Sequence, residues 1–261
     1  MYRKIETDKD IAQLQKDLAT LFKWSSDRLM LFNVEKCKVT HTGYNNSVAS
    51  SRMNGIILQD VVDEQDLEVV MQNDLKCSMQ CAKVVNKANR LLGMIKRTFS
   101  NLTGKVVLGL HRTLVRPQLK YAVQAWRPHL KDIELLEGVQ RRATRMVRSL
   151  GDLTYEDRLK ALRLMTLEKR RLKGELIEVF RIFKGFDKIE ATKLFKINSG
   201  GTRGHELKLN KPRCRLDYRK FTFSHRVVDT WNGLPSEILA CSSVGSFKHQ
   251  LDKFLEVRGF I

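Results

Sequence analysis

The spacing of hydrophobic residues along the chain changes character near residue 76. Beyond it, apolar side chains recur every three or four residues, which is the period of an α-helix with one buried face. The clearest stripe extends over about six turns and consists of Met79, Ala82, Val85, Ala88, Leu92, Ile95 and Phe99. Further helices are predicted at 103–116, 132–150, 155–164, 167–185 and around 247–255. This part of the chain is therefore expected to be helical.

Residues with special backbone preferences predict where these helices begin and end. Pro117 should stop the helix before it, because proline cannot continue the hydrogen-bond ladder. Gly151 is suited to cap the carboxyl end of the helix that precedes it. Thr154 and Thr166 are suited to accept backbone N–H groups at the starts of the two helices that follow them.

The first 75 residues have a different pattern. One amphipathic helix is predicted to begin after Thr7, which forms a capping box with Asp10. Short β-branched runs follow at 38–42, 56–58 and 67–71. Asn54-Gly55 favours a tight hairpin turn between two strands. We therefore expect a small antiparallel sheet packed on this helix, and a chain that is mainly α with a small β part, an α+β fold.

Charge divides the chain at the same place. Residues 1–75 hold nine lysines and arginines against twelve aspartates and glutamates, a net charge of −3, and residues 76–261 carry +22. Such an excess is typical of proteins that bind a polyanion such as nucleic acid, and a lysine-rich solvated surface is the alternative. Ser199-Gly200-Gly201 is typical of a linker. We predict a helix with a small sheet over 1–75, a helical domain over 76–198 and a basic carboxy-terminal region over 199–261.

The candidate nucleic-acid-binding residues are arginines and lysines grouped on the predicted helices. Arg141, Arg145 and Arg148 are spaced to project from one side of a helix, opposite its apolar stripe. Phosphate could bind each guanidinium through two hydrogen bonds, and acidic neighbours elsewhere in the fold are the alternative partners. The candidates in this part of the chain are Lys83, Lys87, Arg90, Lys96, Arg97, Arg141, Arg142, Arg145, Arg148, Arg213, Arg215, Arg219 and Lys220. Tyr218 and Phe221 interleave the last of these, either as stacking platforms for bases or as core.

Patterns typical of enzymes are missing from the sequence. It has no glycine-rich phosphate loop, no Gly-x-Ser-x-Gly and no histidine-rich metal pattern. The dense acidic stretch of Asp60, Asp63, Glu64, Asp66 and Glu68 fits a solvated loop better than a two-metal site. Cys77 and Cys81 could supply half a zinc site, but no nearby residue completes it. We expect no cofactor and no metal.

The location of the protein can also be predicted from its sequence. Its five cysteines are scattered and odd in number, which suits a reducing compartment. No apolar stretch is long enough to span a membrane, and the start has no apolar signal-peptide region. We expect an intracellular protein, nuclear or cytoplasmic, that is not secreted and has no membrane partner.

Seven short runs along the chain resemble one known family. They are Leu31-Phe32-Asn33-Val34-Glu35-Lys36-Cys37-Lys38-Val39, Met53-Asn54-Gly55, Asn86-Lys87-Ala88-Asn89-Arg90-Leu91-Leu92-Gly93, Leu114-Val115-Arg116-Pro117, Tyr121-Ala122-Val123-Gln124-Ala125-Trp126, Val139-Gln140-Arg141-Arg142-Ala143-Thr144 and Val227-Val228-Asp229-Thr230-Trp231-Asn232-Gly233-Leu234-Pro235. In the same order along essentially the whole chain, they are similar to the polymerase protein of non-LTR retrotransposons, the long interspersed element (LINE) class of vertebrates.

The resemblance implies the late palm, thumb and tail of a reverse transcriptase, an RNA-directed DNA polymerase. It implies that the family's catalytic aspartates lie ahead of Tyr2, so this chain would bind RNA or DNA without being an enzyme itself. Lys36 matches the late palm lysine, which adds it to the nucleic-acid-binding candidates. A primer-grip-like strand would contain Asp66, Leu67, Glu68 and Val69. Three positions depart from the family: Glu68 replaces a usual glycine, His111 a tyrosine and Lys120 a glutamate.

Two other functions remain open. A palm sheet without its central strands presents an unpaired edge, so the chain could dock onto an intact element polymerase or associate with itself. Alternatively, it is the product of a decayed element with no selected function. Active polymerisation is disfavoured, because no aspartate pair is available to hold the metals.

Overall fold

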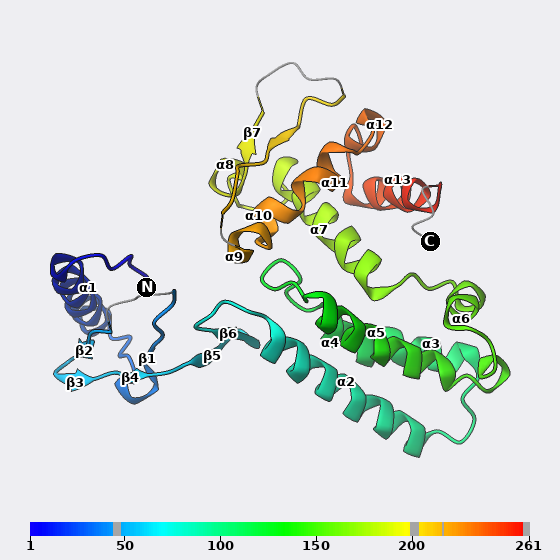
Figure 1. Ribbon diagram of the computed structural model, residues 1–261, viewed down its shortest axis with the longest axis horizontal. Helices are drawn as coiled ribbons and strands as arrows, with labels where there is room; N and C mark the ends of the chain where they lie inside the picture. The colour runs from blue at the N-terminus through cyan, green and yellow to red at the C-terminus, as the bar shows by residue number, and fades with distance from the viewer. Residues whose placement is uncertain (44–47, 199–203, 216, 258–261) are drawn as a thin grey trace. The chain divides into compact units, whose positions relative to one another are not determined.

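The computed structural model describes residues 1–43, 48–198, 204–215 and 217–257. It divides into two compact units, Met1–Met79 and Gln80–Ile261, which we call unit 1 and unit 2. Helices dominate and the strands are short, which confirms the predicted fold class (Figure 1). In the described part of the chain, no helix combines the length and the apolar character needed to cross a bilayer.

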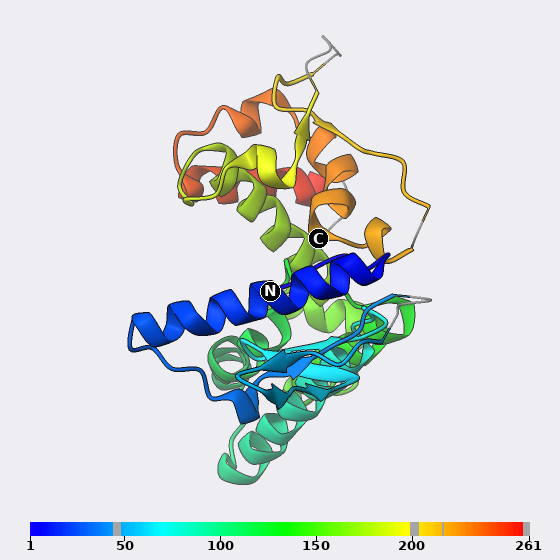
Figure 2. The same ribbon diagram turned by 90° about the vertical axis from the view of Figure 1, so that its left-hand side faces the viewer.

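Unit 1 is built on one long helix, α1 (Asp8–Asp27). The Asp10 carboxylate accepts the backbone N–H of Thr7 at 2.9 Å and its hydroxyl at 2.8 Å, as the capping-box pattern predicts. Leu18 of α1 packs with Met53 and Leu58 in a small core, so the helix lies against the strands that follow (Figure 2). A 3₁₀ turn, η1 (Val34–Lys36), precedes the first strand.

The strands of unit 1 form three separate two-stranded ladders, so the single antiparallel sheet that the sequence predicts is wrong. β1 (Lys38–Val39) pairs in parallel with β4 (Gln59–Asp60). The two antiparallel ladders are β2 (Arg52–Met53) with β3 (Ile56–Ile57), and β5 (Asp63–Asp66) with β6 (Val69–Gln72). Asn54 and Gly55 have φ angles of +51° and +77°, which confirms the predicted hairpin turn. The β-branched runs are too short and too interrupted by charge to extend these ladders.

Unit 2 begins with α2 (Ser78–Thr98), whose buried face includes Val85, Ala88, Leu92 and Ile95. The ends of the predicted stripe are wrong: Met79, Ala82 and Phe99 are exposed, and the face is completed by Cys81 and Val84. Cys81 and Val84 face the core because each residue turns about 100° around the helix, so the buried side is not limited to the positions of the predicted stripe.

Pro117 does not stop the next helical segment, contrary to the sequence prediction. α3 (Gly104–Leu110) leads into a π-helix, η2 (His111–Val115), and then into α4 (Arg116–Lys120). Pro117 lies at the start of α4, in the first turn, where a backbone N–H is not needed by the helix.

α5 (Leu130–Arg145) ends before the predicted Leu150, and a 3₁₀ turn, η3 (Arg148–Leu150), follows it. Gly151 has φ −57°, so it is not the left-handed cap that we predicted. α6 (Tyr155–Leu162) and α7 (Leu167–Phe183) begin where expected, with the hydroxyls of Thr154 and Thr166 accepting backbone N–H groups.

The remaining elements pack around the end of α7. They are α8 (Ala191–Leu194), β7 (Lys196–Ile197), its antiparallel partner β8 (Leu209–Asn210), α9 (Asp217–Lys220), α10 (Phe223–Arg226), α11 (Val228–Asn232), α12 (Ser236–Leu239) and α13 (Val244–Val257). Phe180 of α7 stacks on Phe247 of α13 at 4.1 Å between ring centroids, and Trp231 is fully buried in the same core. The segments 76–198 and 199–261 therefore share one core within unit 2. The proposed linker at Ser199–Gly201 lies outside the described residues.

Candidate nucleic-acid interface

The cations of α2 lie on the side of the helix that faces away from its core. At about 100° per residue, four of them fall within an arc of about 80°: Lys83, Lys87, Arg90 and Arg97. Lys96 lies to one side of this arc. All are exposed except Lys83, which is half-buried. The predicted grouping on one helix is thus present, with Lys96 displaced from the others.

The arginines of α5 do not form the three-membered row that the sequence predicts. Arg141, Arg142 and Arg145 are exposed on the last turns of the helix. Arg148 is not on α5, because the chain leaves helical geometry at Val147 (ψ 107°), whose side chain is 1% exposed. Burial of Val147 against the core turns the chain before Arg148, which is exposed in η3.

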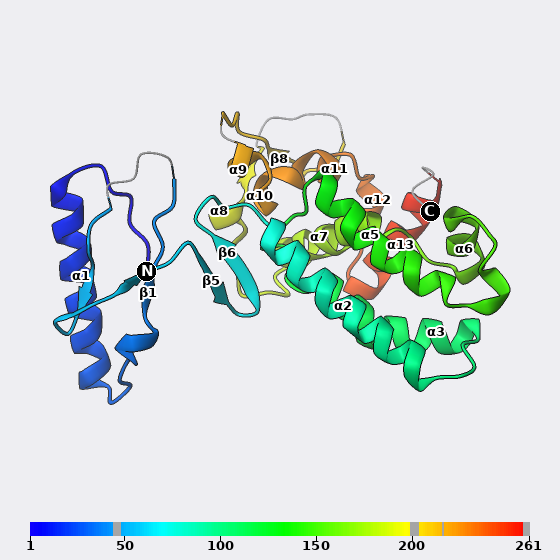
Figure 3. The same ribbon diagram turned by 60° about the horizontal axis from the view of Figure 1, so that its bottom comes forward.

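Two hydrogen bonds join the basic ends of α2 and α5. The Arg142 guanidinium donates through Nε to the side-chain oxygen of Asn89 at 3.1 Å. Arg148 donates through Nη2 to the backbone carbonyl of Ser100, just after α2, also at 3.1 Å. The two helices lie side by side in Figures 1 and 3. These contacts place the carboxy-terminal turns of both helices next to each other, which no sequence pattern specifies.

Because Asn89 contacts Arg142 of α5, the cations on the same side of α2 as Asn89 lie nearest to α5. Lys96 is about 20° from Asn89 around α2, and Arg90 and Arg97 are within about 100°. Lys87 is about 160° away, on the opposite side. We call Arg90, Lys96, Arg97, Arg142, Arg145 and Arg148 the α2–α5 basic face. Lys87 therefore points away from this face, and Lys83, about 120° from Asn89, lies at its border.

Acidic residues compensate only one arginine here. Arg141 forms an ion pair with Glu134 at 2.9 Å, and its guanidinium lies 5.2 Å from the Tyr155 ring centroid on the side toward α6. Among the described residues, the six members of the α2–α5 basic face form no ion pair within 4 Å. Unpaired guanidinium groups on neighbouring turns repel each other, so an added anion would be stabilising.

Glu137, on the same helix as these arginines, is buried. Its carboxylate accepts the backbone N–H of Leu167 at 2.9 Å and the hydroxyl of Tyr155. Burial raises the pKa of Glu137, and burial together with this carboxylate raises the pKa of Tyr155. The Gln140 amide donates to the Tyr155 hydroxyl and to the Met165 carbonyl, which ties α5 to α6 and α7. The helix that carries the arginines is thereby held rigidly.

The basic segment near residue 215 lies elsewhere in unit 2. Arg213 and Arg215 are exposed, as are Arg219 and Lys220 of α9. Phe221 is 43% exposed and packs edge-on against His129, at the amino-terminal end of α5. The α5 arginines are about 18–24 Å further along that helix. The structure therefore separates these four cations from the α2–α5 basic face, and the side chain of Tyr218 lies outside the described residues.

The candidates in unit 1 lie on a turn and a hairpin. Lys36 is exposed at the end of η1. The predicted strand over 67–71 begins only at Val69, because Asp66 pairs with Val69 and the two residues between them form the turn. Leu67 and Glu68 have φ angles of +45° and +65°, a conformation that favours glycine. The backbone at Glu68 would therefore suit a glycine better than a glutamate.

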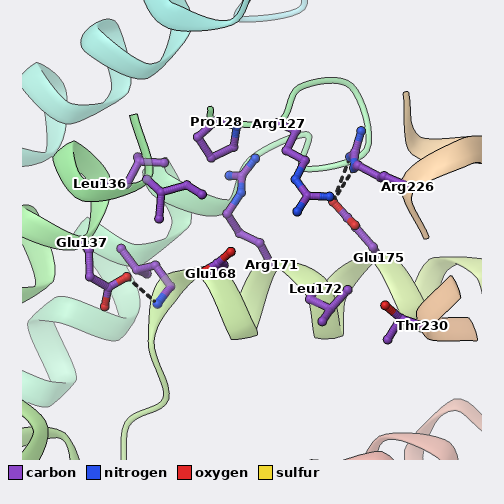
Figure 4. Close-up of a pocket in the computed structure, with 12 residues that line it drawn as sticks. Arg127, Pro128, Leu136, Glu137, Glu168, Arg171, Leu172, Glu175, Arg226 and Thr230 are labelled. Carbon is purple, nitrogen blue, oxygen red and sulfur yellow. Dashed lines mark hydrogen bonds and ion pairs between the residues drawn. The ribbon is translucent and has the colours of Figure 1, made fainter. Parts of the chain in front are cut away.

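A small pocket in unit 2, of about 160 Å³, was missed by the sequence analysis. Figure 4 shows Glu175 turned toward Arg226, and Glu137, which also lines the pocket, accepts the backbone N–H of Leu167. Arg226 donates to the Glu175 carboxylate at 2.8 Å and to the Val123 carbonyl at 2.8 Å. Because its buried charged groups Glu137, Arg171, Glu175 and Arg226 already bind each other or the backbone, and because it is smaller than a ligand cavity, we assign it a structural role.

Neither a metal site in the described residues nor a known relative indicates what this interface binds. In the parts of the chain that the structure describes, no three His, Cys, Asp or Glu side chains gather closely enough to hold a metal ion. Comparison with family models, with curated proteins and with solved structures yields no match. The function has to be argued from the geometry and from the sequence resemblance.

Proposed function

We propose that this chain is a nucleic-acid-binding part of a LINE-type RNA-directed DNA polymerase, without a catalytic centre of its own. RNA or DNA is its partner, and it acts inside the cell. The observation that carries the proposal is the α2–α5 basic face, six cations on and just after α2 and α5 that form no ion pair with a described carboxylate. The family resemblance supports a role in holding template and primer, and the sequence contains no counterpart of the family's aspartate pair.

Phosphate is the chemical group that best fits this face. Five of its six members are arginines, whose guanidinium groups can bind phosphate oxygens in pairs. Asn89 and Ser100 accept one N–H each from Arg142 and Arg148, which leaves the charges of these two arginines unneutralised. A flexible polyanion can contact several of these cations at once.

The direct test is the salt dependence of binding. Fluorescence anisotropy with a labelled 20-nucleotide RNA, and with DNA of the same sequence, should show affinity that falls steeply between 50 and 200 mM salt. Each contacted phosphate contributes about −0.7 to the slope of log K against log salt for a single strand. A slope near zero would refute the proposal.

The absence of catalysis is tested separately. A primed RNA template with labelled nucleotides and Mg²⁺ should give no extension product above the level of a boiled control. Extension of the primer by the purified chain would contradict the non-enzymatic part of the proposal and leave the binding part intact.

Unit 1 supports a second function, association with another protein, which we test as self-association. Its core contains three buried apolar side chains, whereas Leu29, Met30 and Leu31 are 90%, 65% and 73% exposed. Ile56 and Ile57 of β3 are also exposed, on a two-stranded ladder whose other strand, β2, is hydrogen-bonded by Gln15 of α1. Light scattering coupled to size exclusion should show mass rising with concentration in the micromolar range. A constant monomer mass would count against this function, with an intact element polymerase then remaining as the partner to test.

A further inference from the structure

A second group of cations lies along η2 and α4, away from the α2–α5 basic face. Arg112, Arg116 and Lys120 recur every four residues over two consecutive helical elements, so their side chains share one face. Arg116 and Lys120 are half-buried, whereas Arg112 is exposed. The interval of four was visible in the sequence, but the helix was expected to end at Pro117.

Helix α7 adds another cation to this face. The Arg171 guanidinium donates to the carbonyl of Leu119 at 2.8 Å and to that of Trp126 at 2.8 Å, and it lies 3.8 Å over the Trp126 ring. This anchor fixes α7 against the end of α4 and places the preceding residue, Arg170, beside η2 and α4. Lys173 follows one turn later and pairs with Asp252 of α13. Arg112, Arg116, Lys120 and Arg170, from η2, α4 and α7, thus form one cluster of cations whose charges act on one another, and we call this cluster the recess.

The charges in this recess are poorly compensated. Among the described residues, Arg112, Arg116, Lys120 and Arg170 form no ion pair within 4 Å. Asp252 is already paired with Lys173, although its charge still acts on Arg170. Burial, followed by the charges of the neighbouring cations, lowers the pKa of Arg116 and of Lys120. Partly buried like charges of this kind are destabilising unless an anion neutralises them.

One buried polar side chain at the recess also has no partner. His111, the first residue of η2, is 2% exposed, and neither ring nitrogen forms a hydrogen bond. Burial, with the charges of Arg116, Arg170 and Arg112, lowers its pKa to about 4. The imidazole is therefore neutral near pH 7, and its N–H is a buried donor without an acceptor among the described residues. A π-helix at this point is itself typical of functional sites.

We propose that Arg112, Arg116, Lys120 and Arg170 form a phosphate-binding site, separate from the α2–α5 basic face. A phosphate group carries up to two charges on three terminal oxygens, enough to bind several guanidinium forks at once. Because Arg116, Lys120 and Arg170 are half-buried, their charged groups are less screened by solvent than those of an exposed surface, which favours one or two phosphate groups as the ligand. The group could come from a nucleic-acid backbone or from a free oligophosphate.

Calorimetry with inorganic pyrophosphate at low salt tests the site in the full chain. The variant Arg116→Gln/Arg170→Gln removes two cations from the recess, and Arg142→Gln/Arg145→Gln removes two from the α2–α5 basic face as a matched control. For a free oligophosphate, the first variant should weaken pyrophosphate binding at least about tenfold, and the control should change it less than about twofold.

If the bound phosphate belongs to a nucleic-acid backbone, the two variants should give different results in the pyrophosphate and RNA measurements. Pyrophosphate then binds weakly, and the recess variant lowers the salt slope of RNA binding by about 0.7 per lost contact. No pyrophosphate binding by the parent chain together with an unchanged RNA slope in the recess variant would overturn the proposal. If only the control variant, Arg142→Gln/Arg145→Gln, loses RNA binding, the result supports the proposed function of the α2–α5 basic face and counts against a contribution of the recess to RNA binding.

Folding of the recess variant provides an independent readout. Because the variant removes repulsion between partly buried charges, its melting temperature without ligand should equal or exceed that of the parent chain. Pyrophosphate should raise the melting temperature of the parent and of the control, but not that of the recess variant. A lower melting temperature in the ligand-free recess variant would show that these cations stabilise the fold, and would contradict the assignment.

Discussion

Unit 1 and unit 2 differ in how many side chains they bury and in the charge that they carry. Unit 1 has a net charge near zero, a core of three buried apolar side chains with Val69 of β6 buried apart from it, and several large apolar side chains in solvent. Unit 2 carries the excess positive charge and has a larger aromatic core, with a buried ion pair between Arg226 and Glu175 and with His111 buried without a hydrogen bond. The difference indicates that unit 2 presents its cations on a well-packed framework, whereas unit 1 retains surface that suits a partner.

The largest effect is expected at the buried ion pair of unit 2. Arg226→Met would leave the Glu175 carboxylate without a cation and the Val123 carbonyl without a donor, at a cost of about 3–5 kcal/mol. Urea unfolding followed by the fluorescence of buried Trp126 and Trp231 measures it. The double variant Glu175→Gln/Arg226→Met should recover much of the loss.

The matching change in unit 1 is Arg3→Met, which breaks an ion pair with Asp17 that is about one-third exposed. It should move the unfolding midpoint far less, because solvent screens that pair. Similar losses of unfolding free energy in Arg226→Met and Arg3→Met would contradict the proposed difference between the two units.

The next effect concerns the pH dependence of unit 2. The pKa of His111 is about 4 in the folded chain and about 6.5 when unfolded, so the unfolded state binds more protons between these values. Stability from this residue is complete above pH 6.5 and falls by about 3 kcal/mol as the pH drops to 4. His111→Phe should remove that part of the pH dependence in urea titrations. Equal slopes in the variant and the parent would show that His111 is not held neutral.

The smallest effect lies in the hairpin of unit 1. Glu68 adopts a positive φ in the turn between β5 and β6, so Glu68→Gly should stabilise the hairpin by about 0.5–1 kcal/mol. Hydrogen exchange of the β5 and β6 amides should slow accordingly. Gln65→Gly, within β5, is the control and should have the opposite effect. Faster exchange in Glu68→Gly would mean that its side chain stabilises the turn.

Local sequence signals predicted the local structure well. The caps at Thr7, Thr154 and Thr166 and the turn at Asn54-Gly55 depend on a few neighbouring residues, and the structure confirms them. The strand over 67–71 was misplaced because β-branched composition does not show where a turn intervenes.

Long-range packing explains what the sequence could not predict. The end of α5 depends on the burial of Val147, and the position of Glu137 depends on Tyr155 and Leu167 in later elements. The grouping of six cations depends on which side of α2 meets α5, which is specified by the contact between Asn89 and Arg142. The residue types of the candidate interface could be predicted, and their arrangement could not.

The central claim is that the α2–α5 basic face binds nucleic-acid phosphates. It is tested most directly by the salt slope of RNA binding in Arg142→Gln/Arg145→Gln, compared with Lys16→Gln/Lys23→Gln, which removes two exposed charges from α1 of unit 1. We predict that the first variant flattens the slope by about 1.4, two contacts at about 0.7 each, and that the second leaves it unchanged. Equal slopes in the two variants would contradict the claim.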